Sequence, residues 1–104
     1  MIQYETRGGG IPFRDWLLSL RDIEVRARIR SRLNRLALGN PGDCESVGSG
    51  IFELKFHFGP GYRVYFGYKG KQAVILLLGG DKSTQRKDIE TAQDYWRDYQ
   101  QGDS

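Results

Sequence analysis

Residues 51–68 read IFELKFHFGPGYRVYFGY, which is two alternating runs joined by the turn Gly59-Pro60-Gly61. Every second residue of each run is apolar or aromatic, and most of the residues between them are polar. The alternating apolar positions are Phe52, Leu54, Phe56, Phe58, Tyr62, Val64, Phe66 and Tyr68. Because successive strand residues point to opposite faces of a sheet, this pattern predicts a β-hairpin with one buried face.

The chain after this hairpin supplies two further elements. Gln72–Leu78 is apolar on both faces, which predicts a strand covered on both sides, and Gly79-Gly80 should end it. A C-terminal helix is expected from about Thr84, because apolar residues recur there at helical spacing. Its apolar stripe consists of Ile89, Ala92, Trp96 and Tyr99.

The first forty residues predict a short strand and then two helices. Met1–Thr6 alternates like a strand, Pro12 suits the first position of a helix, and Asp22 suits the N-cap of the next. The second helix should end at Gly39-Asn40-Pro41-Gly42. The predicted fold class is therefore α+β, with a mainly antiparallel sheet packed against an N-terminal helical hairpin, plus a C-terminal helix.

Length and composition limit the function classes. The 104 residues suit one domain, with residues 1–99 ordered and a short polar tail over 100–104. The longest apolar run, Ala73–Leu78, falls short of the ~20 residues of a membrane span, and no signal-peptide pattern opens the chain. We therefore expect a cytoplasmic protein. Cys44 and His57 are the only residues of their types, so we expect no disulfide, metal or cofactor.

Arginines dominate the second predicted helix. Residues 1–42 contain eight arginines and no lysine, in a chain of net charge +3. The planar guanidinium favours paired hydrogen bonds to phosphate or carboxylate, so this helix suits an RNA backbone or an acidic protein surface. A solvated helix face is the simpler alternative. The arginines concerned are Arg26, Arg28, Arg30, Arg32 and Arg35.

The polar face of the predicted hairpin brings chemical groups together. Strand alternation places Glu53, Lys55 and His57 on one face, beside Arg63 and Tyr65 of the next strand. This face suits an RNA backbone, with the tyrosine available for stacking. It also suits cleavage by the ribose 2′-hydroxyl, which needs a proton acceptor, cations at the phosphate and a proton donor. The simpler alternative is the solvated face of a half-exposed sheet.

Two more cations follow the last predicted strand. Lys82 and Arg86 lie between the end of that strand and the start of the last helix, close enough in sequence to join the cationic site. The surrounding residues, GGDKS over 79–83, lack the spacing of a P-loop, so a nucleotide cofactor is not expected.

Several of these segments together carry a family resemblance. FELKFHFGPGYRVY over residues 52–65, LLGGDKSTQ over 77–85, FRDWL over 13–17 and LGNPG over 38–42 are similar to the HigB-like "addiction module killer" branch of the RelE/ParE toxin superfamily. The resemblance extends over about residues 1–99. It implies a type II toxin that a cognate antitoxin, often a helix-turn-helix protein of the HigA-like kind, holds inactive.

The resemblance also implies an activity and the residues that carry it. RelE- and HigB-like members cleave mRNA on the translating ribosome without a metal, whereas ParE-like members poison DNA gyrase. By motif position Arg63 matches the catalytic arginine, Lys55 lies on the strand of the catalytic lysines, and Lys82 lies near a further basic position. The sequence departs at Glu53, where a RelE-type site has lysine, and at Asp88-Ile89, where some relatives have a tyrosine base.

These departures make His57 our candidate for the proton acceptor. The predicted function is an mRNA endoribonuclease that inhibits translation. The alternatives are a ParE-like gyrase inhibitor and a toxin-derived interaction module without activity. Because Arg63 is expected to face solvent, Arg63→Ala should abolish toxicity and change stability by no more than about 0.5 kcal/mol. Lys55→Ala should act in the same way but more weakly, and Arg28→Ala should affect binding more than cleavage.

Overall fold

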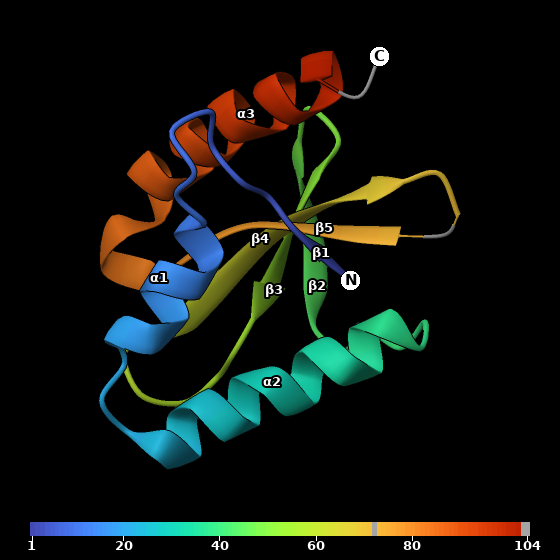
Figure 1. The fold of residues 1–104 in the computed structure, drawn as a ribbon. Helices are drawn as coiled ribbons and strands as arrows, with labels where there is room; N and C mark the ends of the chain where they lie inside the picture. Colours follow the sequence, from blue (N-terminus) through green and yellow to red (C-terminus); the bar gives the residue numbers. More distant parts are fainter. Residues whose placement is uncertain (72, 103–104) are drawn as a thin grey trace.

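The computed structural model describes residues 1–71 and 73–102, and within them a five-stranded sheet is flanked by helices (Figure 1). The sheet has the strand order β1-β5-β4-β3-β2. Its strands are β1 (Ile2–Gln3), β2 (Cys44–Gly48), β3 (Ile51–Lys55), β4 (Tyr62–Lys69) and β5 (Ala73–Asp81). The helices are α1 (Pro12–Ser19), α2 (Ile23–Ala37) and α3 (Gln85–Gly102), and the 3-10 turn η1 (Lys82–Thr84) precedes α3.

The sheet is mixed. β2 with β3, β3 with β4 and β4 with β5 are antiparallel pairs, whereas β1 runs parallel to β5. The α+β class, the β-hairpin of β3 and β4 and the mainly antiparallel sheet are therefore confirmed, with one parallel pairing added by the N-terminus. The predicted strand Met1–Thr6 is shorter than expected, because Thr6 and Gly10 bond to each other in a turn.

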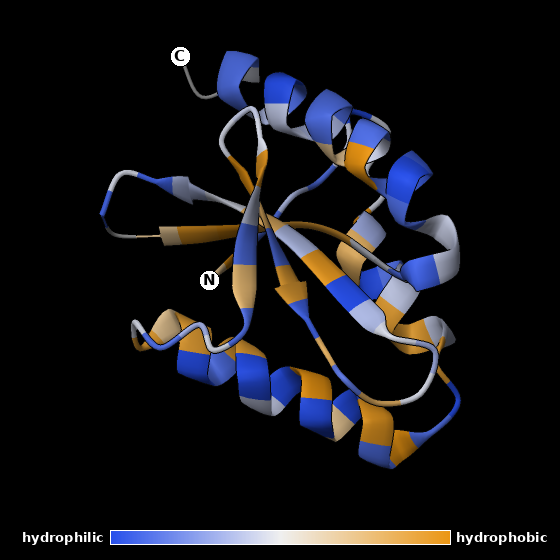
Figure 2. Cartoon of the chain, turned by 180° about the vertical axis from the view of Figure 1, so that it is seen from behind, coloured by the Kyte–Doolittle hydropathy of each residue, from blue (hydrophilic) through white to orange (hydrophobic). Residues whose placement is uncertain are grey.

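The two N-terminal helices begin where their capping residues predict. Pro12 occupies the first turn of α1, and the carboxylate of Asp22 accepts a hydrogen bond of 2.9 Å from the N–H of Glu24 at the start of α2. Hydrophobic residues recur along α2 at helical spacing among hydrophilic ones (Figure 2), and they form an apolar side that packs on the sheet. Its buried residues are Ile29, Leu33 and Leu36.

α1 and α2 cover one face of the sheet. The predicted inward side chains Leu54, Phe56, Val64 and Phe66 are buried there, as expected from the alternation. The residues that complete this core are Phe13, Leu17, Ile29, Leu33, Leu36, Val74 and Leu76.

α3 covers the opposite face, which we expected to be polar and solvated. That expectation is wrong for Glu53, Arg63 and Tyr65, whose exposed fractions are 1%, 5% and 0%. The physical reason is the apolar stripe of α3, which needs a surface to pack on and finds it here. This second core contains Tyr4, Ile51, Tyr65, Ile75, Leu77, Ala92 and Trp96.

Two strand ends differ from the prediction. β3 ends at Lys55, three residues before Phe58, so His57 lies in the loop that leads to β4. β5 continues through Gly79 and Gly80 to Asp81 instead of stopping at the glycines. Gln72, where this strand was expected to begin, lies outside the described residues.

The glycine pair in β5 serves close packing on both faces. A Cβ at Gly79 would overlap the ring of Trp16 on α1, and a Cβ at Gly80 would overlap the carboxylate of Asp88 on α3. Glycine inside a strand often marks such an approach. At the C-terminus, α3 continues to Gly102, so residues 100–102 are helical and not part of a polar tail; residues 103–104 lie outside the described residues.

Candidate functional site

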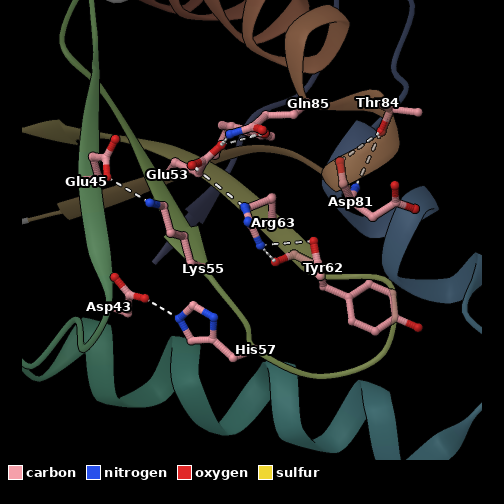
Figure 3. A network of polar contacts seen from close by, with 12 residues as sticks. Asp43, Glu45, Glu53, Lys55, His57, Tyr62, Arg63, Asp81, Thr84 and Gln85 are labelled. Atoms are coloured by element: carbon pink, nitrogen blue, oxygen red, sulfur yellow. Dashed lines mark hydrogen bonds and ion pairs between the residues drawn. The ribbon is translucent and has the colours of Figure 1, made fainter.

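A buried polar network lies under the first turn of α3 (Figure 3). Glu53 on β3 faces Arg63 on β4, with 3.7 Å between Oε1 and Nε. The other carboxylate oxygen of Glu53 accepts hydrogen bonds from the hydroxyl of Tyr65 at 2.9 Å and from Nε2 of Gln85 at 2.8 Å. Burial and this hydrogen bond raise the pKa of Tyr65, so the phenol stays a neutral donor.

Arg63 holds the loop that precedes its own strand. Its Nη1 donates to the carbonyl oxygens of Gly61 at 3.0 Å and Tyr62 at 3.1 Å, while its buried Nε has no hydrogen-bond partner among the residues that the structure describes. Gly61 has a φ of 79° and packs against Lys82, where a Cβ would approach the lysine Cγ to 2.9 Å. The expected solvent-facing guanidinium is therefore wrong, and the structure shows it positioning this loop. Its role at a scissile phosphate stays a prediction.

Tyr65 and Lys55 are also less open than expected. Tyr65 is completely buried, so the structure contradicts an exposed ring available for base stacking. The Lys55 side chain is 23% exposed, and its Nζ lies 2.7 Å from Oε2 of Glu45 on β2. This hydrogen bond raises the pKa of Lys55 and keeps it charged. Lys55 sits opposite Arg63 in the β3–β4 register, so the two cations remain neighbours.

His57 is paired with a carboxylate that sequence reasoning missed. Its Nε2 hydrogen-bonds to Asp43, and the two side chains are 68% and 48% exposed (Figure 3). The hydrogen bond to His57 lowers the pKa of Asp43. Asp43 lies 14 residues before its partner in a loop of no regular pattern, so nothing in the sequence indicated the pair. With Nε2 engaged, Nδ1 is the imidazole nitrogen left for a ligand.

A hollow of about 410 Å³ lies between α2 and the loop after β3, and we call it the cationic groove. Its lining residues are Arg28, Ser31, Arg32, Arg35, Phe56, His57 and Phe58. The guanidinium carbon of Arg28 lies 3.6 Å from the centroid of the Phe58 ring, a cation–π contact that orients it.

Arg32 serves the fold as well as the groove. It donates to the carbonyl oxygens of Lys55 at 3.0 Å and Pro41 at 3.1 Å. These bonds connect α2 to the end of β3 and to the loop between α2 and β2. Burial lowers the pKa of Arg32. This side chain is half-buried and engaged with protein carbonyls, which differs from the freely exposed phosphate-binding residue that we expected.

The structure separates the remaining predicted cations. Arg30 lines another hollow, between α1, α2 and β1. Arg26 is half-buried, and its Nε has no hydrogen-bond partner within residues 1–71 and 73–102. Lys82 lines a hollow that adjoins the groove at His57. Arg86 is exposed on the first turn of α3 and lines neither of these spaces. The predicted residues thus converge on the groove only in part.

The groove combines a proton-transfer group with fixed cations. An imidazole oriented by a carboxylate is suited to general acid–base chemistry, and arginines stabilise charge that develops on a phosphate. Within residues 1–71 and 73–102, no cluster of three His, Cys, Asp or Glu side chains is placed to hold a metal ion. The same residues contain no helix that is long and apolar enough to span a bilayer.

Comparison with known proteins gives the family. A sequence model for the family described as "Phage derived protein Gp49-like (DUF891)" matches residues 15–97. A Haemophilus influenzae protein described as "Uncharacterized protein" is 49% identical over 91 residues, which cover 88% of this chain and 89% of that protein. No solved structure matches. The chain therefore belongs to the Gp49-like phage-derived family, whose members are RelE-like toxins of toxin–antitoxin modules.

Proposed function

We propose that this protein is the toxin of a HigB-like type II module and that it cleaves mRNA in the cytoplasm, thereby inhibiting translation. The observation that carries the proposal is the exposed His57 in the wall of the cationic groove, whose imidazole is hydrogen-bonded to Asp43. It supplies a proton acceptor at a place where arginines gather, as RNA cleavage requires.

In the proposed reaction the ribose 2′-oxygen attacks the neighbouring phosphorus. Its proton passes to Nδ1 of His57, while Asp43 stabilises the imidazolium that forms. The bond from phosphorus to the 5′-oxygen breaks, which leaves a 2′,3′-cyclic phosphate and a 5′-hydroxyl. Arg28 and Arg35 stabilise the negative charge on the crowded phosphate, Lys82 adds positive charge from the other side of His57, and the leaving oxygen takes its proton from water.

Arg63 and Lys55 support this reaction from beside the groove. Arg63 fixes the carbonyls of Gly61 and Tyr62, and so holds the loop against which Lys82 packs. Lys55 lies opposite Arg63 in the strand register and adds positive charge there, and its ammonium group is held by Glu45. Both residues of the motif therefore contribute to the proposed reaction, Arg63 by positioning the loop and Lys55 by its charge.

The family's place in toxin–antitoxin modules supplies a partner. We expect a HigA-like helix-turn-helix antitoxin whose acidic segments cover the arginines of α2, with mRNA and the ribosome as targets once it is released. Since these contacts are electrostatic, association should slow as rising salt shortens the Debye length to ~8 Å and below.

Primer extension on cellular mRNA after brief induction tests the activity. The wild-type protein should produce discrete cuts within translated frames, and His57→Ala should reduce cutting by about 10²- to 10⁴-fold. Arg14→Ala, which removes an exposed cation on α1 outside the groove, is the matched control and should cut normally. Intact messages together with DNA damage signalling would contradict the proposal and favour gyrase poisoning.

A further inference from the structure

His57 belongs to the wall of two adjoining hollows. One is the cationic groove, and the other is a hollow of about 290 Å³ lined by residues 56–61 and Lys82. Phe56, His57 and Phe58 line both spaces, so this short segment forms a ridge between them. The His57 side chain on this ridge is 68% exposed, which leaves its ring accessible to a ligand that crosses from one hollow to the other.

Each hollow presents positive charge. The groove offers Arg28 and Arg35 from α2, and the second hollow offers Lys82 from η1. Among the described residues, neither hollow is lined by a carboxylate. The ligand expected here carries negative charge at two points, one on each side of the histidine.

The aromatic rings at the ridge have little surface left for bases. Phe56 is 1% exposed, and Phe58 has the Arg28 guanidinium over one face and the Tyr62 ring 5.6 Å from its centroid. Single-strand binders that grip bases use open aromatic faces, whereas contacts to phosphates carry no sequence information. Recognition at this ridge should therefore run through the backbone of the ligand and tolerate any base.

We propose that the two hollows bind successive phosphates of one single-stranded RNA, which passes over His57 between them. This inference rests on the proposed function and adds the path and the backbone character of substrate binding. A single strand can bend over the ridge and present its 2′-hydroxyl to the imidazole, whereas an A-form duplex holds its backbone in a regular helix.

Salt-dependent binding of a 2′-O-methyl oligouridylate tests the path without cleavage, because this RNA has no free 2′-hydroxyl. An oligomer of about 8 nucleotides falls within the site sizes of single-strand binders. Arg35→Gln and Lys82→Gln should each weaken binding and reduce the slope of log K against log salt by about 0.7, the value for one lost phosphate contact. The double variant should lose about twice that slope.

Arg30→Gln is the matched control, because it removes the same charge from α2 but faces the hollow beside α1 and β1. It should leave the slope unchanged.

A slope that responds to Arg35→Gln and not to Lys82→Gln would overturn the two-hollow path. An equal reduction of the slope by Arg30→Gln would also overturn it. A protein that binds across both hollows and cuts no message would refute the proposed function alone, whereas one that cuts message with unchanged slopes would refute this path alone.

Discussion

The α3 side of the sheet buries its charges, whereas the α2 side displays them. On the first side Arg63 is 5% exposed and lies beside the fully buried Glu53. On the second side Arg28 and Arg35 are exposed along a groove that also contains His57. In both regions these charged or titratable side chains lie on faces that the sequence pattern predicts to be polar. What covers a face, and not its pattern alone, decides whether its charges support the fold or meet a ligand.

The two regions also differ in energetic terms. Removing a buried ion pair from water costs several kcal/mol per ion, so Arg63 and Glu53 depend on each other and on Tyr65, Gln85 and the loop carbonyls. The exposed groove cation Arg35 keeps much of its hydration, and the fold loses little stabilisation when it is removed. Substitutions in the buried network should therefore act on stability, and substitutions in the groove on binding.

Arg63→Ala should cause the largest loss of stability. It leaves the Glu53 carboxylate buried without its cation, which typically costs about 3–5 kcal/mol. Arg35→Ala, at an exposed groove position, should change stability by no more than about 0.5 kcal/mol. Urea unfolding followed by circular dichroism measures both free energies of unfolding.

A second substitution at Glu53 separates the lost charge partner from the lost packing. In the Arg63→Ala background, Glu53→Gln removes the unpaired charge, while its amide oxygen still accepts from Tyr65 and Gln85. Stability should then partly recover. Equal losses for Arg63→Ala and Arg35→Ala would show that burial does not distinguish these two regions.

The sequence predicted one face of this sheet better than the other, for physical reasons. Alternation in residues 51–68 correctly placed Leu54, Val64 and Phe66 in the core, because strand period determines which residues share a face. It could not tell that α3 would cover the opposite face and bury Arg63. The apolar Tyr65 and the doubly apolar run Ala73–Leu78 were the signals that a second core exists.

The candidate site was predictable only in part. The motif around Arg63 and the lone His57 indicated the end of the sheet where the loop after β3 meets α2, and the cationic groove lies there. Asp43 could not be found, because loop conformation alone brings it to the histidine. The role of Arg32 in capping carbonyls was equally invisible, since helical spacing places it among the other arginines and the tertiary contact alone distinguishes it.

Alanine substitutions at the two glycines of β5 test how closely α1 and α3 pack on the two faces of the sheet. At Gly79 the new methyl group meets the rigid ring of Trp16, so Gly79→Ala should destabilise by about 1–3 kcal/mol through overpacking. At Gly80 it meets the end of the Asp88 side chain, which can move, so Gly80→Ala should cost less. Thermal unfolding of both variants provides the comparison.

Gly8→Ala is the control for these two substitutions, because the nearest neighbour of its Cβ would be the Thr6 hydroxyl at 4.0 Å. This variant should unfold at nearly the wild-type temperature. A greater loss at Gly80 than at Gly79 would mean that α3 is packed more rigidly than α1, opposite to the expectation from the two contacts.

Asp88→Asn should have the smallest effect, and its sign should depend on pH. Burial raises the pKa of Asp88 above its ordinary 3.8, although the hydrogen bond from Thr84 opposes the shift. The folded state thus holds its proton more tightly than the unfolded state, and stability falls as pH rises through the folded pKa. Asparagine cannot ionise, so the variant should gain stability relative to wild type between about pH 4 and pH 7, by no more than about 1 kcal/mol.

Thr84→Val should steepen the fall in stability with rising pH, because it removes the hydroxyl that stabilises the Asp88 carboxylate. Urea unfolding at both pH values measures the change, and a difference that stays constant with pH would show that the α3 side does not hold this carboxyl in a desolvated state.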